Sequence, residues 1–215
     1  MKYETEEYII NYNECDKEYI EDFIKYFEQE KENIFNFFNI EKLDKKLIIT
    51  LYDELEKYAE YRHHQLFETS VGNMDVDENN YYIHMLSYKE LIKRKSHTLD
   101  QLDYLYKIVV HEFVHVCHES VEPVRKSLIW IREGIACLLS HQYDHREMEL
   151  KNCELEDLLN DNMLLYINYY SLMNYALINY GIDYVRQLIF NSEFGKEETS
   201  KIYEDFINKK SIRTI

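Results

Sequence analysis

The stretch VVHEFVHVCHE, residues 109–119, places two histidines four positions apart, with a glutamate directly after the first. Apolar residues separate these polar ones at helical spacing, and positions i and i+4 of a helix lie about 40° apart around its axis. His111 and His115 are therefore expected to point the same way, with Glu112 beside them. Such a pair can bind a metal ion from one helix face, or it can be two partnered histidines on a packed helix.

A second candidate ligand is Glu133 in WIREGIA (130–136), which follows His115 after seventeen intervening residues. A catalytic zinc ion takes three protein ligands and keeps one position for water, so the two histidines need a third ligand. An antiparallel helix after a short loop could return Glu133 to the height of His115, and the small Gly134 and Ala136 would let that helix approach closely. A lone glutamate on an amphipathic helix is usually a surface residue, but two such stretches together favour a metal site.

The two stretches together resemble a known enzyme family. HEFVH followed by WIREGIA is similar to the gluzincin zinc metallopeptidases, specifically to the peptidase MA-like and aminopeptidase-type branch with its HExxH…WxxEGxA pattern. The likeness continues through YYSLMNYALINYGIDYVRQLI (169–189), which resembles the tyrosine-bearing helix of the family and the short helix after it. The resemblance spans about residues 80–190 in recognisable order.

This resemblance implies a zinc-dependent peptidase with one zinc ion per chain. His111, His115 and Glu133 would hold the metal, and Glu112 would be the general base. The metal would polarise the scissile carbonyl group and lower the pKa of its bound water towards ~7, and Glu112 would pass a proton from this water to the leaving amine. A tyrosine on the later helix would stabilise the oxyanion, and Tyr170 matches that position best, although three more tyrosines lie nearby: Tyr166, Tyr169 and Tyr175.

The sequence departs from the family pattern in two places. Thermolysin carries an aspartate four residues after its glutamate ligand, and Cys137 stands at the corresponding position here. The residue that would support a zinc-binding histidine from outside the ligand shell is therefore not identified. The Gly-x-Met-Glu-Asn motif with which aminopeptidases anchor their substrates is also absent. An endopeptidase or a narrow processing enzyme, acting on a peptide or protein substrate, is favoured over N-terminal trimming.

Two other functions remain open on the sequence alone. One is a catalytically silent gluzincin-like binding or immunity module that keeps the zinc site, although such a module has no need of Glu112. The other is a structural metal site closed by a fourth protein ligand, either His118 or Cys137. The run RHH at 62–64 is more typical of a solvated helix end than of a metal site.

Hydrophobic periodicity predicts an α+β chain. In residues 1–95 we expect a mixed α/β sheet lobe with strands and helices in the order 3–13 (strand), 16–39 (helix), 45–52 (strand), 53–67 (helix), then a turn at Asp77–Asn80 and a strand. In residues 96–215 we expect a helical lobe with helices at 98–119, 123–143, 169–181 (capped by Gly181), 182–190 and 196–208. The resemblance implies a thermolysin-like fold, one metallopeptidase domain over 1–215 with its active site between the lobes. It also implies an extended substrate along an edge strand near Tyr82–Leu86.

Composition excludes several partner classes. The net charge of −16 argues against nucleic acid and anionic lipid, because both require a basic surface. No apolar run approaches the roughly 20 residues of a membrane helix, and the N-terminus MKYETEEYII lacks a secretory signal pattern. Four cysteines without CxxC pairing are typical of reduced thiols. We therefore expect a soluble cytoplasmic protein, with leaderless or processed secretion as the alternative.

Overall fold

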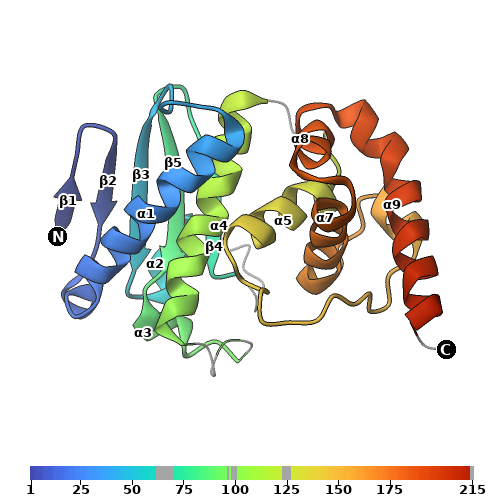
Figure 1. Ribbon diagram of the computed structural model, residues 1–215. Helices are drawn as coiled ribbons and strands as arrows, with labels where there is room; N and C mark the ends of the chain where they lie inside the picture. The colour runs from blue at the N-terminus through green and yellow to red at the C-terminus, as the bar shows by residue number, and fades with distance from the viewer. Residues whose placement is uncertain (62–69, 96, 98–100, 123–126, 214–215) are drawn as a thin grey trace. The chain divides into compact units, whose positions relative to one another are not determined.

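The computed structural model describes residues 1–61, 70–95, 97, 101–122 and 127–213 of the chain. They form an α+β protein, in which a mixed five-stranded sheet comes first and a mostly helical part follows (Figure 1). The predicted order of sheet and helices is confirmed. The chain divides into two compact units, Met1–Ser120 and Val121–Ile215, so the helix that carries HEFVH belongs to the unit with the sheet. The predicted lobes at 1–95 and 96–215 stay a prediction.

The sheet of the first unit has the strand order β1-β2-β3-β5-β4. Its strands are β1 (Lys2–Glu4), β2 (Tyr8–Asn11), β3 (Lys46–Tyr52), β4 (Gly72–Val76) and β5 (Asn80–Leu86). The three central strands are parallel, with Ile10, Ile49 and Ile83 in register, and the edge strands β1 and β4 pair antiparallel to their neighbours. The sheet is mixed, as expected from the sequence.

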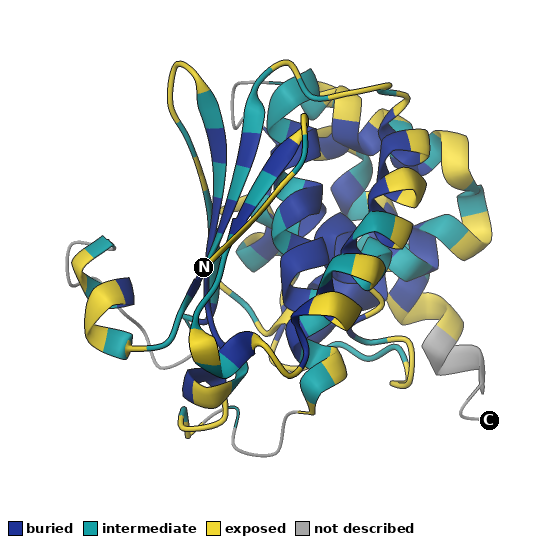
Figure 2. Ribbon diagram, turned by 90° about the vertical axis from the view of Figure 1, so that its left-hand side faces the viewer, coloured by how far each residue is buried: buried dark blue, intermediate teal, exposed yellow. Residues whose placement is uncertain are grey.

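Side-chain alternation along the strands decides which face of the sheet is buried. Along β3, buried residues alternate with partly exposed ones, and this banding is visible in Figure 2. Leu47, Ile49 and Leu51 make up the buried set on β3, each at most 2% exposed. Successive side chains of a strand point to opposite faces, so one face of this sheet joins the core.

Helices α1 (Ile20–Phe38) and α4 (Leu102–Val121) form the other layer of that core. Phe27 of α1 lies between Tyr8 of the sheet and Phe113 of α4, with ring centroids 5.3 Å and 5.1 Å away. Phe35 also packs on Phe113, at 5.6 Å. Shorter helical segments complete the unit: a 3-10 turn at Glu14–Asp16, α2 (Leu55–Tyr61) and α3 (Tyr88–Leu91). The predicted helix at 16–39 and strand at 45–52 are confirmed within a few residues.

Two hairpins differ from the sequence prediction. The single strand predicted at 3–13 is broken into β1 and β2 by a turn that Thr5 closes, since its hydroxyl accepts the backbone N–H of Tyr8 at 3.0 Å. The turn predicted at Asp77–Asn80 is confirmed, because the Asp77 carboxylate accepts the N–H groups of Asn79 and Asn80, both at 2.8 Å. The strand before this turn, β4, was not predicted. Its sequence GNMDV is poor in the residues that favour strands.

The second unit consists of helices joined by loops in the residues that the structure describes. Its helices are α5 (Ile129–Leu139), α6 (Leu155–Leu159), α7 (Tyr166–Tyr180), α8 (Ile182–Phe190) and α9 (Ser192–Arg213). Gly181 ends α7 with φ of +86°, a conformation that favours glycine, so its predicted role as a cap is confirmed. The helix predicted at 123–143 is shorter, and residues 123–126 lie outside the described part, as do 98–100 before α4.

Two further expectations can be compared with these elements. Of the helices described, none is both long enough and apolar enough to cross a membrane. The four cysteines, Cys15, Cys117, Cys137 and Cys153, are all free thiols, as predicted from their spacing.

Phe27 should be a major contributor to the stability of the first unit, because it is fully buried between two aromatic rings. Replacing it with alanine leaves a cavity, so Phe27→Ala should lower the free energy of unfolding by about 3–5 kcal/mol. Lys25→Ala, at an exposed position of the same helix, should change it by less than about 0.5 kcal/mol. Urea denaturation of both variants checks this. A loss below about 1 kcal/mol for Phe27→Ala would contradict the assigned core.

Candidate metal centre

Helix α4 carries both histidines of the HEFVH motif and is deeply buried. Val109, Phe113 and Val116 are fully buried, as their spacing predicts. Further residues between them are also fully buried, namely Val110, Val114 and Cys117. The partly exposed positions of this stretch include Glu112 and His115, while His111 is only 6% exposed. The packing of α4 therefore fixes the backbone beneath the motif, buries His111 and leaves Glu112 and His115 partly exposed.

The imidazole rings of His111 and His115 approach each other through their Nε2 atoms. Nε2 of His111 and Nε2 of His115 lie 3.2 Å apart, and the rings are at 80° to one another. Two imidazole nitrogens bound to one tetrahedral zinc ion, each about 2.0–2.1 Å from it, are separated by about 3.3 Å. The observed separation therefore fits a shared metal ion. Each Nε2 must be unprotonated to bind the metal, so acid should weaken binding.

Glu112 follows His111 on α4 and packs against Gly72, the first residue of β4. A Cβ atom built on Gly72 would be 2.8 Å from Oε1 of Glu112 and 2.8 Å from Cγ2 of Ile108. Ile108 and Glu112 are four residues apart on α4, so this face of the helix packs on the backbone of β4. Gly72 is one of only four glycines in the chain, and its neighbours in the sequence do not mark it as a functional residue.

The prediction of an edge strand near Tyr82–Leu86 is wrong. These residues belong to β5, which lies between β3 and β4 and pairs with both. The strand at this edge of the sheet is β4, and its first residue, Gly72, is the one that approaches Glu112. The periodicity of Tyr82–Leu86 correctly indicates a strand, but it does not show whether that strand has one neighbour or two.

Glu133 lies on α5, at a position that the surrounding helices hold in place. The Asp161 carboxylate accepts the N–H of Ile129 at the first turn of α5, at 2.7 Å. One residue later, the indole N–H of Trp130 donates to the hydroxyl of Thr199 on α9, at 3.1 Å, in a buried contact. Glu133 itself is half-buried. Two hydrogen bonds thus fix the start of the helix one turn before the candidate ligand.

Gly134 lies where α5 packs on α7. A Cβ atom at this position would lie 2.9 Å from the carbonyl oxygen of Tyr169 and 3.0 Å from Cβ of Met173, both on α7. The missing side chain therefore allows close packing of α5 on α7, within the second unit. The space that Gly134 leaves is filled by α7, and the expectation that small residues let α5 approach the histidine helix stays a prediction.

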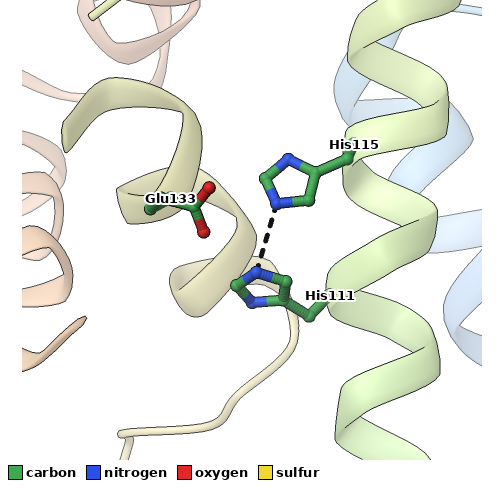
Figure 3. A group of neighbouring side chains, drawn as sticks. All are labelled: His111, His115 and Glu133. Carbon is green, nitrogen blue, oxygen red and sulfur yellow. Dashed lines mark hydrogen bonds between the residues drawn. The ribbon is translucent and has the colours of Figure 1, made fainter. Parts of the chain in front are cut away.

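His111, His115 and Glu133 form a group that could hold a metal ion (Figure 3). Each offers one ligand atom, and the three atoms all lie within 4.8 Å of one another. Two imidazole nitrogens and one carboxylate oxygen are ligands that suit zinc, and three protein ligands leave a position for water. Among the described residues, these three form the group with this property, and they are the three that the sequence singles out.

The alternative fourth ligands lie elsewhere. The ring of His118 packs against Phe38 of α1, with centroids 6.2 Å apart, and its side chain is buried in the first unit. Cys137 is fully buried in the second unit with Ile167 and Tyr170. Neither belongs to the group of candidate ligands. The RHH run at 62–64 lies outside the described residues.

The tyrosine-bearing helix predicted from the resemblance is α7. Tyr170 is 3% exposed, its hydroxyl accepts the side-chain amide of Asn174 at 3.2 Å, and its ring lies 5.7 Å from that of Tyr143. Burial raises the pKa of Tyr170, with a smaller contribution from Asp144. A tyrosine that stays protonated can donate a hydrogen bond to an oxyanion. The assignment of Tyr170 to this role stays a prediction.

The negative charge of Glu133 affects the pKa of Tyr169, another tyrosine of α7. Burial raises the pKa of Tyr169 to about 12, and the negative charge of Glu133 adds to this increase. Its hydroxyl is already engaged, since it accepts the N–H of Leu164 at 2.7 Å and donates to the carbonyl of Asn162 at 3.2 Å. Tyr169 therefore ties the loop before α7 to its helix.

Comparisons of the chain with protein-family models, with curated proteins and with solved structures found no match. The resemblance to the gluzincins therefore rests on the motif residues themselves and on the group that they form, which could hold a metal ion.

We predict that the purified protein contains one zinc ion per chain, because two imidazoles at metal-ligand spacing and a carboxylate suit this ion. Elemental analysis after purification without added metal should show this stoichiometry. His115→Ala and Glu133→Ala should each lose most of the zinc. His118→Ala on the same helix is the matched control and should retain it. Full retention of zinc in a His115→Ala, Glu133→Ala double variant would refute the ligand set.

Proposed function

We propose that this protein is a zinc-dependent peptidase of the gluzincin type, with a thermolysin-like fold. His111, His115 and Glu133 would be the zinc ligands and Glu112 the general base. The observation that carries the proposal is the pair of Nε2 atoms 3.2 Å apart, grouped with a carboxylate, on a helix that also presents a second carboxylate outside this group. A structural metal site needs ligands only, whereas a hydrolytic site also needs a base that does not bind the metal.

The chemistry is divided between the metal and Glu112. When bound, zinc supplies a Lewis acid that polarises a carbonyl group and lowers the pKa of a bound water to about 7. Glu112 accepts a proton from the attacking water and delivers it to the nitrogen of the leaving amine. Because α4 is anchored in the core, its backbone fixes the point from which the Glu112 side chain extends relative to the two histidines. Tyr170 is the proposed donor to the oxyanion.

The substrate would be an extended peptide or protein segment that adds to the sheet at β4. This strand is paired on one side by β5 and is the last strand of the sheet as described. An edge strand can offer alternating N–H and C=O groups to an extended chain, a common mode of peptide recognition. The close approach of Gly72 to Glu112 puts the start of that edge beside the proposed base. Backbone recognition of this kind suits an endopeptidase.

Glu112→Gln should abolish turnover without removing the metal. Glutamine is nearly isosteric but cannot accept the proton, and a general base typically contributes 10²–10⁴-fold. We therefore expect kcat on any cleaved peptide to fall by at least about 10²-fold, with zinc content and unfolding midpoint close to wild type. Peptide-library digestion followed by mass spectrometry identifies the substrates and measures the loss.

The matched control is Glu119→Gln, two turns further along α4, which should retain full activity. If Glu112→Gln cleaves peptides as fast as wild type while retaining zinc, Glu112 is not the base. If wild type binds zinc and peptides but cleaves none, the protein is a binding module with a retained metal site.

Backbone pairing with β4 predicts a periodic response to changes in the substrate backbone. Successive N–H groups of an extended peptide point to opposite sides, so only alternate ones can bond to β4. In a series of cleaved peptides, each methylated at one backbone nitrogen, kcat/KM should fall about tenfold or more at every second position, since a buried hydrogen bond is lost each time. Positions distant from the cleaved bond provide the comparison. A uniform response along the series would contradict strand pairing.

A further inference from the structure

The start of β4 is held in place by the sheet. Gly72 is paired with Met85 of β5, and the N–H of Leu86 donates to the carbonyl of Val71 at 3.0 Å. These contacts fix the backbone at Gly72 relative to the central strands. The strand therefore has little freedom to move away from α4 without breaking its pairing with β5.

Space, not backbone conformation, accounts for the glycine at position 72. The described glycine with positive φ is Gly181, so the backbone at Gly72 is one that any residue can adopt. A Cβ atom there would lie 2.8 Å from Oε1 and 3.2 Å from Cγ of Glu112, and 2.8 Å from Cγ2 of Ile108. Non-bonded carbon atoms are best placed about 3.5–4.0 Å apart, so a methyl group at this position would displace one of its neighbours.

The two neighbours differ in how they can respond. Ile108 is 3% exposed, and its Cγ2 branches directly from the β carbon, so the helix backbone fixes this atom. Glu112 is half-buried, and its Oε1 is the end of a side chain with several rotatable bonds. An added methyl group would therefore strain the packing at Ile108 and push the carboxylate of Glu112 to a new position.

We infer that Gly72 is a positioning residue, whose missing side chain provides the space that the Glu112 carboxylate occupies on the helix of the two histidines. This inference rests on the proposed function in so far as Glu112 is the general base. A misplacement of about 1 Å can cost about 10²-fold in rate. The effect of filling the space should therefore be on the chemical step, and only weakly on metal binding or substrate binding.

The first test measures the contact without any need for activity. Gly72→Ala should lower the urea midpoint of unfolding, and the shift should be clearly smaller when Glu112→Ala removes the obstructing carboxylate. Two residues in contact give such non-additive effects, whereas independent ones do not. Asn73→Ala, at the next position of β4, is the matched control and should give the same shift in both backgrounds. Equal shifts for Gly72→Ala in both backgrounds would overturn the inferred contact.

The second test measures positioning through kinetics. To remove the separate strain at Ile108, all variants carry Ile108→Ala. In this background Gly72→Ala should lower kcat by about 10–100-fold, with KM changed less than about threefold and one zinc ion retained. With Glu112→Asp also present, the side chain is one methylene shorter, so the contact at 2.8 Å is removed and the milder contact at the γ carbon, 3.2 Å from the added methyl group, remains. The further loss on Gly72→Ala should then be less than about threefold.

The outcomes separate this inference from the proposed function. An equal loss of kcat with glutamate and with aspartate at position 112, or a loss of zinc in Gly72→Ala, would show that Gly72 has only a structural role. A fully active Glu112→Gln variant would refute the proposed mechanism, and the unfolding experiment would still report whether Gly72 and Glu112 are in contact.

Discussion

The candidate metal centre depends on a single helix, α4, which packs in the core of the first unit and also carries the side chains of the HEFVH motif. Helix α4 buries Phe113 and its neighbours under the sheet, and it also carries the buried imidazole of His111 and the partly exposed side chains of Glu112 and His115. Burying a polar imidazole is costly unless a partner satisfies it. The two Nε2 atoms of His111 and His115 face each other at 3.2 Å, so a single proton or a single metal ion can satisfy both. Core packing thus fixes the spacing that suits a metal.

Packing against β4 adds a second constraint on the same helix. Ile108 and Glu112 face the backbone of Gly72 so closely that no side chain fits between them. The sheet pairing of β4 and the burial of α4 therefore act together on the carboxylate that we propose as the base. Tight packing transmits small changes in volume, so a single methyl group in a strand can affect a side chain on a helix. Gly72 of β4 therefore affects the position of Glu112 on α4.

The sequence predicts the candidate ligands better than it predicts their surroundings. His111, His115 and Glu133 could be identified because ligand chemistry restricts both residue type and spacing, and the structure groups the same three. The position of a strand within its sheet depends on pairing between distant segments, so periodicity alone could not show that Tyr82–Leu86 lies inside the sheet. The helix faced by Gly134 depends likewise on tertiary packing. Neighbouring residues in the sequence do not indicate why position 72 is a glycine, because the cause is the close approach of Ile108 and Glu112 in the folded chain.

The most direct test of the account is the ligand set of the bound metal, measured by zinc X-ray absorption spectroscopy. We expect only nitrogen and oxygen ligands, at about 2.0–2.2 Å from the zinc ion, with outer-shell scattering from two imidazole rings. A sulfur ligand at about 2.3 Å, as Cys137 would give, or scattering from a third imidazole, as His118 would give, would contradict it.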